Sequence, residues 1–138
     1  MQSQTPKSLA MRNPDARHLD FSALVGLIPA NPKLLPSNLD MVYERHGYFL
    51  IAEWKRSSER LSKGQEILLR ALAKTKGFTV LLITGDTDDG MSILEIDQMT
   101  PAGPIVPKGK TVGDLKNLIV TWFDWVERKK SISPVEKQ

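Results

Sequence analysis

A predicted β-hairpin over residues 36–55 constrains the fold of this chain more than any other feature. Residues 40–44 and 48–54 are rich in β-branched and aromatic side chains, which favours two strands. His46 and Gly47 lie between them and predict a two-residue turn, because glycine readily adopts a positive φ. The stretch reads PSNLDMVYERHGYFLIAEWK.

The register of this hairpin brings two carboxylates together. A two-residue turn pairs Arg45 with Tyr48 and, counting back, Asp40 with Glu53, whereas a longer turn would shift this register. Directly opposed side chains lie about 5 Å apart at Cβ, so two carboxylates there repel unless a cation separates them. Oxygen ligands of this kind suit Mg²⁺ or Mn²⁺. Lys55, two residues after Glu53, projects from the same face and places an ammonium beside this site.

The composition describes one ordinary globular domain. The chain has 138 residues, 41% of them hydrophobic and 25% charged, and no apolar run reaches the ~20 residues that span a membrane. It has no cysteine, which excludes a disulfide framework, a thiolate zinc site and a cysteine nucleophile. Without a signal peptide at the N-terminus we expect a cytoplasmic protein. We expect a flexible arm over 1–18, one domain over 19–130 and a flexible tail over 131–138.

The remaining elements predict an α/β fold in which helices flank a mixed β-sheet. A short helix begins the domain, with Asp20 as its N-cap. After the hairpin, Ser62 caps a helix that ends before Gly77, and an apolar run bounded by glycines then indicates a buried strand parallel to its predecessor. The predicted ranges are helix 19–28, helix 63–75, strand 78–84, strand 91–99, loop 100–110 and helix 111–129.

Basic residues concentrate just after the hairpin. Residues 55–76 contain seven basic and two acidic side chains, although the net charge of the whole chain is only +3. A basic surface beside a carboxylate pair suits a polyanionic substrate, and ordinary charge segregation on a solvated helix face is the alternative. The candidate nucleic-acid-binding residues are Lys33, Arg56, Arg60 and Lys63.

Asp40 followed by Glu53-Trp54-Lys55 on a strand–turn–strand frame resembles the PD-(D/E)XK nuclease superfamily. Gln65, in the first turn of the next helix, is similar to the glutamine of the Holliday-junction-resolvase-like and VRR-NUC branches. The resemblance covers about residues 19–85 and implies a restriction-endonuclease-like core. The chain departs from the family order in having one strand fewer before the middle helix and no glutamate on the first helix.

The resemblance implies a metal-dependent endonuclease that hydrolyses DNA and, by family analogy, acts at branched or flapped structures. Asp40 and Glu53 would hold one or two Mg²⁺ or Mn²⁺ ions, with the backbone carbonyl of Trp54 as a further ligand. Asp20 is either an additional metal ligand or only a helix cap. Lys55 and Gln65 would act on the attacking water or the phosphate. Small nucleases of this kind often work as homodimers.

Two other functions remain open. A nucleic-acid-binding module could keep the same fold without catalysis, in which case the chain would bind DNA without cleaving it. A non-nuclease α/β protein could also carry the short motif by accident. In that protein the Asp40 and Glu53 carboxylates would lie more than about 8 Å apart and face different ways, given ~2.1 Å magnesium–oxygen bonds.

Overall fold

The computed structural model describes residues 20–132, and their side chains as far as Lys129. The predicted arm over 1–18 and residues 133–138 of the predicted tail lie outside the described residues. The chain divides between Asn38 and Leu39 into two compact units, which are described separately.

In the first unit, the prediction of an α-helix over residues 19–28 is wrong. Only a 3-10 helix, η1 (Ser22–Leu24), forms there. Gly26 has a φ of 79°, which is incompatible with a right-handed helix, and Pro29 and Pro32 follow closely. The prediction of Asp20 as the N-cap is also wrong, because Phe21 holds that position without a side-chain hydrogen bond. Asp20 lies one residue earlier, and its Oδ1 accepts a hydrogen bond from the Ser22 backbone nitrogen at 2.9 Å.

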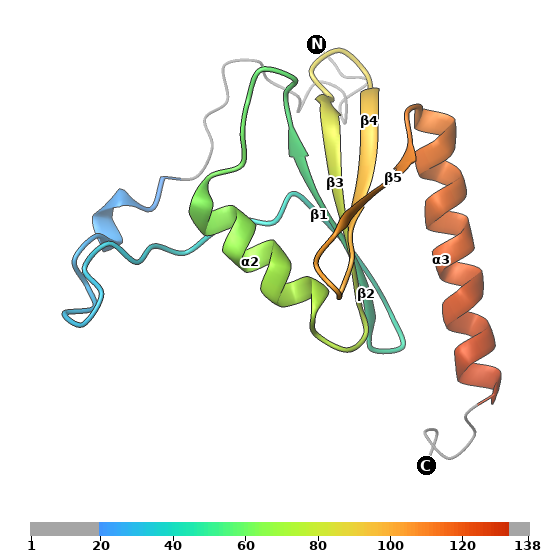
Figure 1. The fold of residues 1–138 in the computed structure, drawn as a ribbon, viewed down its shortest axis with the longest axis horizontal. Helices are drawn as coiled ribbons and strands as arrows, with labels where there is room; N and C mark the ends of the chain where they lie inside the picture. Colours follow the sequence, from blue (N-terminus) through green and yellow to red (C-terminus); the bar gives the residue numbers. More distant parts are fainter. Residues whose placement is uncertain (1–19, 133–138) are drawn as a thin grey trace, which may run out of the picture. The chain divides into compact units, whose positions relative to one another are not determined.

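The second unit is a five-stranded mixed sheet flanked by two helices, which confirms the predicted fold class at this level (Figure 1). The strands lie side by side in sequence order, and all neighbouring pairs are antiparallel except β2 and β3. The elements are β1 (Met41–Arg45), β2 (Tyr48–Lys55), α2 (Lys63–Ala73), β3 (Phe78–Asp86), β4 (Ser92–Met99), β5 (Ile105–Gly109) and α3 (Val112–Ile132).

The crossover from β2 through α2 to β3 makes the parallel pair, as the sequence predicted. Parallel neighbours need such a connection, because a tight turn can only reverse the chain. Gly77 ends the crossover with a φ of 90°, and its carbonyl oxygen accepts a hydrogen bond from the Phe49 nitrogen at 2.8 Å. The two strands therefore start level at the end of the sheet remote from Lys55.

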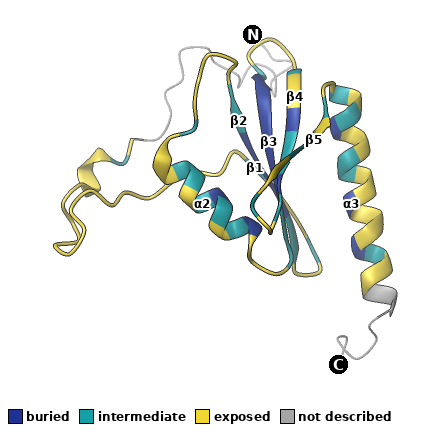
Figure 2. Cartoon of the chain, in the orientation of Figure 1, coloured by how far each residue is buried: buried dark blue, intermediate teal, exposed yellow. Residues whose placement is uncertain are grey.

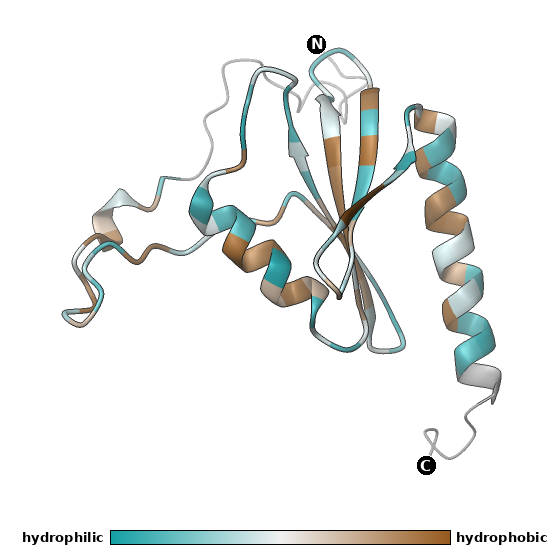
Figure 3. Cartoon of the chain, viewed as in Figure 1, coloured by the Kyte–Doolittle hydropathy of each residue, from teal (hydrophilic) through white to brown (hydrophobic). Residues whose placement is uncertain are grey.

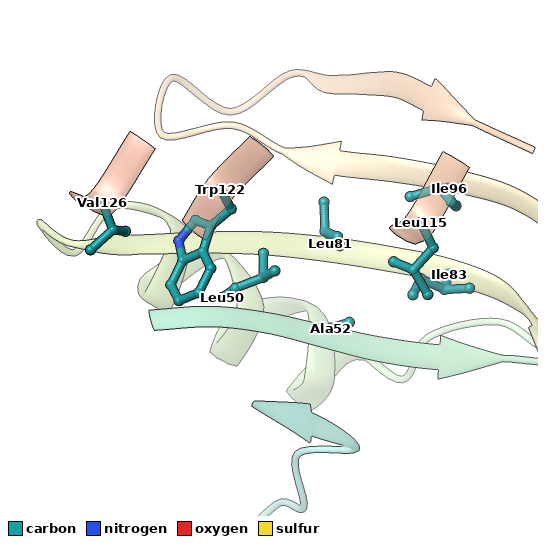
Figure 4. Packing of buried hydrophobic residues seen from close by; sticks show 8 residues of the cluster. All are labelled: Leu50, Ala52, Leu81, Ile83, Ile96, Leu115, Trp122 and Val126. Carbon is teal, nitrogen blue, oxygen red and sulfur yellow. The ribbon is translucent and has the colours of Figure 1, made fainter. Parts of the chain in front are cut away.

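The two faces of the sheet carry separate cores, because side chains alternate along each strand. On one face α3 covers residues of β2, β3 and β4 (Figure 4), and on the other α2 packs over Val80 and Met99 through Leu69 and Ala73. The most buried segments are the central strands, while the outer side of α3 is exposed (Figure 2). The first core consists of Leu50, Ala52, Leu81, Ile83, Ile96, Leu115, Trp122 and Val126.

Helix α3 is the longest element, and hydrophobic residues recur among hydrophilic ones along it (Figure 3). Residues at helical spacing form its apolar side: Leu115, Trp122 and Val126 belong to the first core, and Leu118 and Ile119 pack against it. No helix among residues 20–132 combines the length and apolar character needed to cross a bilayer.

Strand β5 was missed, because residues 100–110 carry three prolines and were predicted as a loop. β5 is an edge strand, where a proline need not donate a hydrogen bond to a neighbour. Pro107 pairs there with Asp97 of β4.

Candidate functional site

The hairpin has the predicted register. His46 and Gly47 both have positive φ, 53° and 84°, as the common two-residue turn requires. Arg45 pairs with Tyr48, and the ladder ends with Met41 opposite Ala52. Asp40 lies one residue beyond this ladder, so its predicted pairing with Glu53 is not part of the ladder, but it is close enough for its charge to act on Glu53.

Asp40 is held by the neighbouring strand although it precedes β1. Its Oδ2 accepts a hydrogen bond from the Trp54 backbone nitrogen at 2.9 Å. The carboxylate thus reaches across to β2 next to Glu53, while the side chain of Asp40 stays exposed to solvent. An exposed carboxylate fixed by one oxygen leaves its other oxygen available to a ligand.

Glu53 is the unusual residue of the site. Only 5% of its surface is exposed, and its Oε1 is buried without a hydrogen-bond partner. Burial raises the pKa of Glu53 to about 7, together with the negative charge of Asp40 and a hydrogen bond that the two carboxyl groups share when Glu53 is protonated. A buried acceptor without a partner costs free energy, so this carboxylate needs a proton or a cation to satisfy it.

Gln65 links Glu53 to the start of α2. Its Nε2 donates a hydrogen bond to Glu53 Oε2 at 2.9 Å. Its backbone nitrogen donates to the Ser62 hydroxyl at 3.1 Å, and its Oε1 accepts from the Ser62 nitrogen at 3.3 Å. This capping box confirms Ser62 as the helix cap and holds the Gln65 amide in a fixed orientation. Gln65 therefore donates a hydrogen bond to Oε2 of Glu53 and makes none to Oε1.

Lys55 lies on the same face of β2 as Glu53 but does not neutralise it. Its Nζ donates to the Glu59 carbonyl oxygen at 3.5 Å, and no ion pair joins Lys55 to a carboxylate within the described residues. Trp54, between them, turns its side chain to the core under α3. Its carbonyl as a metal ligand stays a prediction.

The candidate nucleic-acid-binding residues differ in their surroundings. Arg56 is already paired, with Asp88 Oδ2 at 2.5 Å and Asp86 Oδ2 at 3.7 Å. Arg60 and Lys63 are exposed near the start of α2. Lys33 belongs to the first unit, as does Asp20, and their predicted roles stay predictions.

Two oxygens of this site suit a divalent cation. The buried Oε1 of Glu53 has no partner, and Asp40 adds a second carboxylate beside it. In the described part of the chain no group of three or more histidine, cysteine, aspartate or glutamate side chains is placed to hold a metal ion. A cation bound here would take its further ligands from backbone carbonyls, water or substrate, as Mg²⁺ commonly does.

A second acidic pair, absent from the sequence-based predictions, lies on the same face. Asp97 pairs with Leu82 and Glu95 with Thr84, the β3 residues that also pair with Glu53 and Lys55. The alternation of acidic residues along β4 was visible in the sequence. Their register was not, because it depends on an irregularity between Thr84 and Gly85.

Comparisons of the chain with protein-family models, with curated proteins and with solved structures found no match.

Proposed function

We propose that the chain is a metal-dependent endonuclease of the PD-(D/E)XK type, in which Asp40 and Glu53 hold Mg²⁺ or Mn²⁺ and the substrate is DNA. The observation that carries this proposal is the buried, unpartnered Oε1 of Glu53 beside Asp40. A structural carboxylate in that position would have its acceptors satisfied, whereas a metal ligand keeps one oxygen for the ion.

Each side chain then has a separate task. Asp40 and Glu53 bind the cation, and Gln65 fixes the orientation of Glu53 through Oε2. Lys55 offers an ammonium on the same face, which can stabilise charge that develops on a phosphate. A divalent cation held by Asp40 and Glu53 would supply Lewis acidity, which would activate water and offset charge on the scissile phosphate.

The sheet supports this proposal in part. The acidic hairpin, the following helix with its glutamine and the buried parallel strand occur in the order that the family motif requires. The restriction-endonuclease-like core has a helix before its first strand, whereas residues 20–38 contain only η1. Preference for branched DNA, a homodimeric state and a cytoplasmic location belong to the proposal as expectations from the family and from composition.

Cleavage of supercoiled plasmid and of a branched oligonucleotide, with Mg²⁺ or Mn²⁺, tests the proposal. We expect cleavage by the wild-type chain and losses of about 100-fold or more in Glu53→Gln and Lys55→Met, in line with the effects of lost metal ligands and charge donors. Asp124→Asn and Lys116→Met are matched controls, since both residues are exposed on α3 over the other face. Cleavage that survives in Glu53→Gln would contradict the proposal.

The competing function is a nucleic-acid-binding module without catalysis. It is favoured by the two-carboxylate ligand set and by the contact of Lys55 with Glu59 instead of with the acidic pair. Under this alternative the wild-type chain would shift the DNA in a binding assay and leave it intact with every metal.

A further inference from the structure

Arg56 differs from the other basic residues near the candidate site, because its charge is already paired. It directly follows Lys55, so it lies at the end of β2 that also carries Glu53. From Lys55 to Lys63, the ion pairs that the described structure forms all belong to Arg56. The partners of Arg56 therefore decide whether its charge is available to a substrate.

These partners are two carboxylates of the acidic turn, the name used here for residues 86–90 between β3 and β4. Asp88 Oδ2 lies 2.5 Å from one terminal nitrogen of Arg56, and Asp86 Oδ2 lies 3.7 Å from the other. A guanidinium binds a phosphate through the same pair of donors. The acidic turn thus occupies the nitrogens that a phosphate of DNA would use.

The base of the acidic turn holds these oxygens in place. Asp86 ends β3 opposite Ser92. Its Oδ1 accepts a hydrogen bond from the Asp88 nitrogen at 3.2 Å, which leaves Oδ2 for Arg56. Gly85 has no room for a side chain, since a Cβ there would overlap the Ser92 carbonyl oxygen. The two strands therefore approach closely just before the turn, and both carboxylates are presented to the end of β2.

The contact with Arg56 is nevertheless open to displacement. The side chains of Arg56 and Asp88 are both 53% exposed, and that of Asp86 is 41% exposed. Exposed ion pairs add little to folding stability, because water solvates the separated charges well. Each phosphate along a DNA backbone carries a full negative charge, so DNA can replace the two carboxylates on the guanidinium.

We propose that the acidic turn is an autoinhibitory element, in which Asp86 and Asp88 hold Arg56 until a DNA phosphate displaces them. This inference rests on the nuclease function proposed above and adds a regulation of the same site. The turn lowers the affinity for DNA in general, because every phosphate that binds Arg56 must first replace an internal partner. Arg56 then contributes most where the DNA also reaches the neighbouring basic residues.

Fluorescence anisotropy with a labelled DNA duplex tests the contact, in the presence of a chelator that prevents metal-dependent cleavage. Asp88→Asn keeps the shape of the side chain and removes its charge, and we expect it to tighten DNA binding by about threefold or more. Asp89→Asn is the matched control, because it removes an equal charge from the same turn. Among the residues that the structure describes, the Asp89 carboxylate forms no ion pair, so the gain from Asp89→Asn should be smaller.

The Arg56→Gln background shows whether the gain acts through the guanidinium. In that background Asp88→Asn and Asp89→Asn should change the dissociation constant by the same factor, because the cation that Asp88 holds has been removed. Equal effects of the two asparagine variants on the wild-type background would overturn the inference. So would an advantage of Asp88→Asn that persists in Arg56→Gln.

Cleavage separates this inference from the function on which it rests. A wild-type chain that binds DNA and cleaves none with Mg²⁺ or Mn²⁺ overturns the nuclease function, and the affinities still decide the role of the acidic turn. Cleavage by the wild-type chain, with equal affinities for Asp88→Asn and Asp89→Asn, overturns the autoinhibition alone. Failure of the wild-type chain and of every variant to bind DNA overturns both.

Discussion

Glu53 combines two properties that conflict in a stable fold, since it is a carboxylate and it is almost fully buried. Gln65 lowers the free-energy cost of burying this carboxylate by donating a hydrogen bond to one of its oxygens. Asp40 raises that cost by placing a second negative charge close to Glu53. Arrangements of this kind are common at functional sites, where a ligand supplies what the protein lacks.

The metal-free protein should therefore lose stability as the pH rises. The pKa of Glu53 is about 7 in the folded protein and about 4.5 in the unfolded chain, so the folded state binds this proton more tightly. The destabilisation is absent below about pH 4.5, grows up to about pH 7 and is complete above it. It amounts to roughly 3 kcal/mol for a shift of this size.

Urea unfolding near pH 5 and near pH 8, in the presence of a chelator, measures this loss. Glu53→Gln carries no charge at either pH, so its free energy of unfolding should fall less than that of the wild-type chain between the two conditions. The same fall in both proteins would show that Glu53 does not titrate in this range.

At the scale of elements, the hairpin, both long helices and the βαβ crossover could be predicted, because each has a strong local signal. His46-Gly47 identifies the turn, and Ser62 with Gln65 identifies a helix start. The closeness of Asp40 to Glu53 follows from the turn, because the ladder that the turn sets ends one residue before Asp40. The alignment of Asp97 with Glu53 could not be predicted, because it depends on an irregular register between β3 and β4.

The turn should control hairpin stability but not the site itself. Gly47→Ala places a side chain at a φ of 84° and should cost about 1 kcal/mol of unfolding free energy. Gly64→Ala, in the first turn of α2 and with open space around it, should be neutral or stabilise by up to about 1 kcal/mol. Thermal unfolding of both variants measures the contrast.

Cleavage by Gly47→Ala should stay within about twofold of wild type below its melting temperature, because Asp40 and Glu53 lie at the other end of the hairpin. Equal melting temperatures for the two glycine variants would argue against the turn geometry.

At the scale of the whole molecule, the larger core lies on one face of the sheet and the candidate site lies on the other. Helix α3 covers the first face with the larger core. On the second face α2 covers only part of the strands, and the acidic residues and Lys55 occupy the end near its first turn. Arg45, next to the hairpin turn, forms a 2.7 Å ion pair with Glu127 of α3, which adds a contact between the edge strand and this helix.

The central claim is that Asp40 and Glu53 together bind a divalent cation, and calorimetric titration with Mn²⁺ near pH 8 tests it most directly. We predict one bound ion in the wild-type chain and in the control Asp124→Asn, and a loss of about tenfold or more in affinity in both Asp40→Asn and Glu53→Gln. Binding of Mn²⁺ to Glu53→Gln with wild-type affinity, or no binding to the wild-type chain, would contradict the claim.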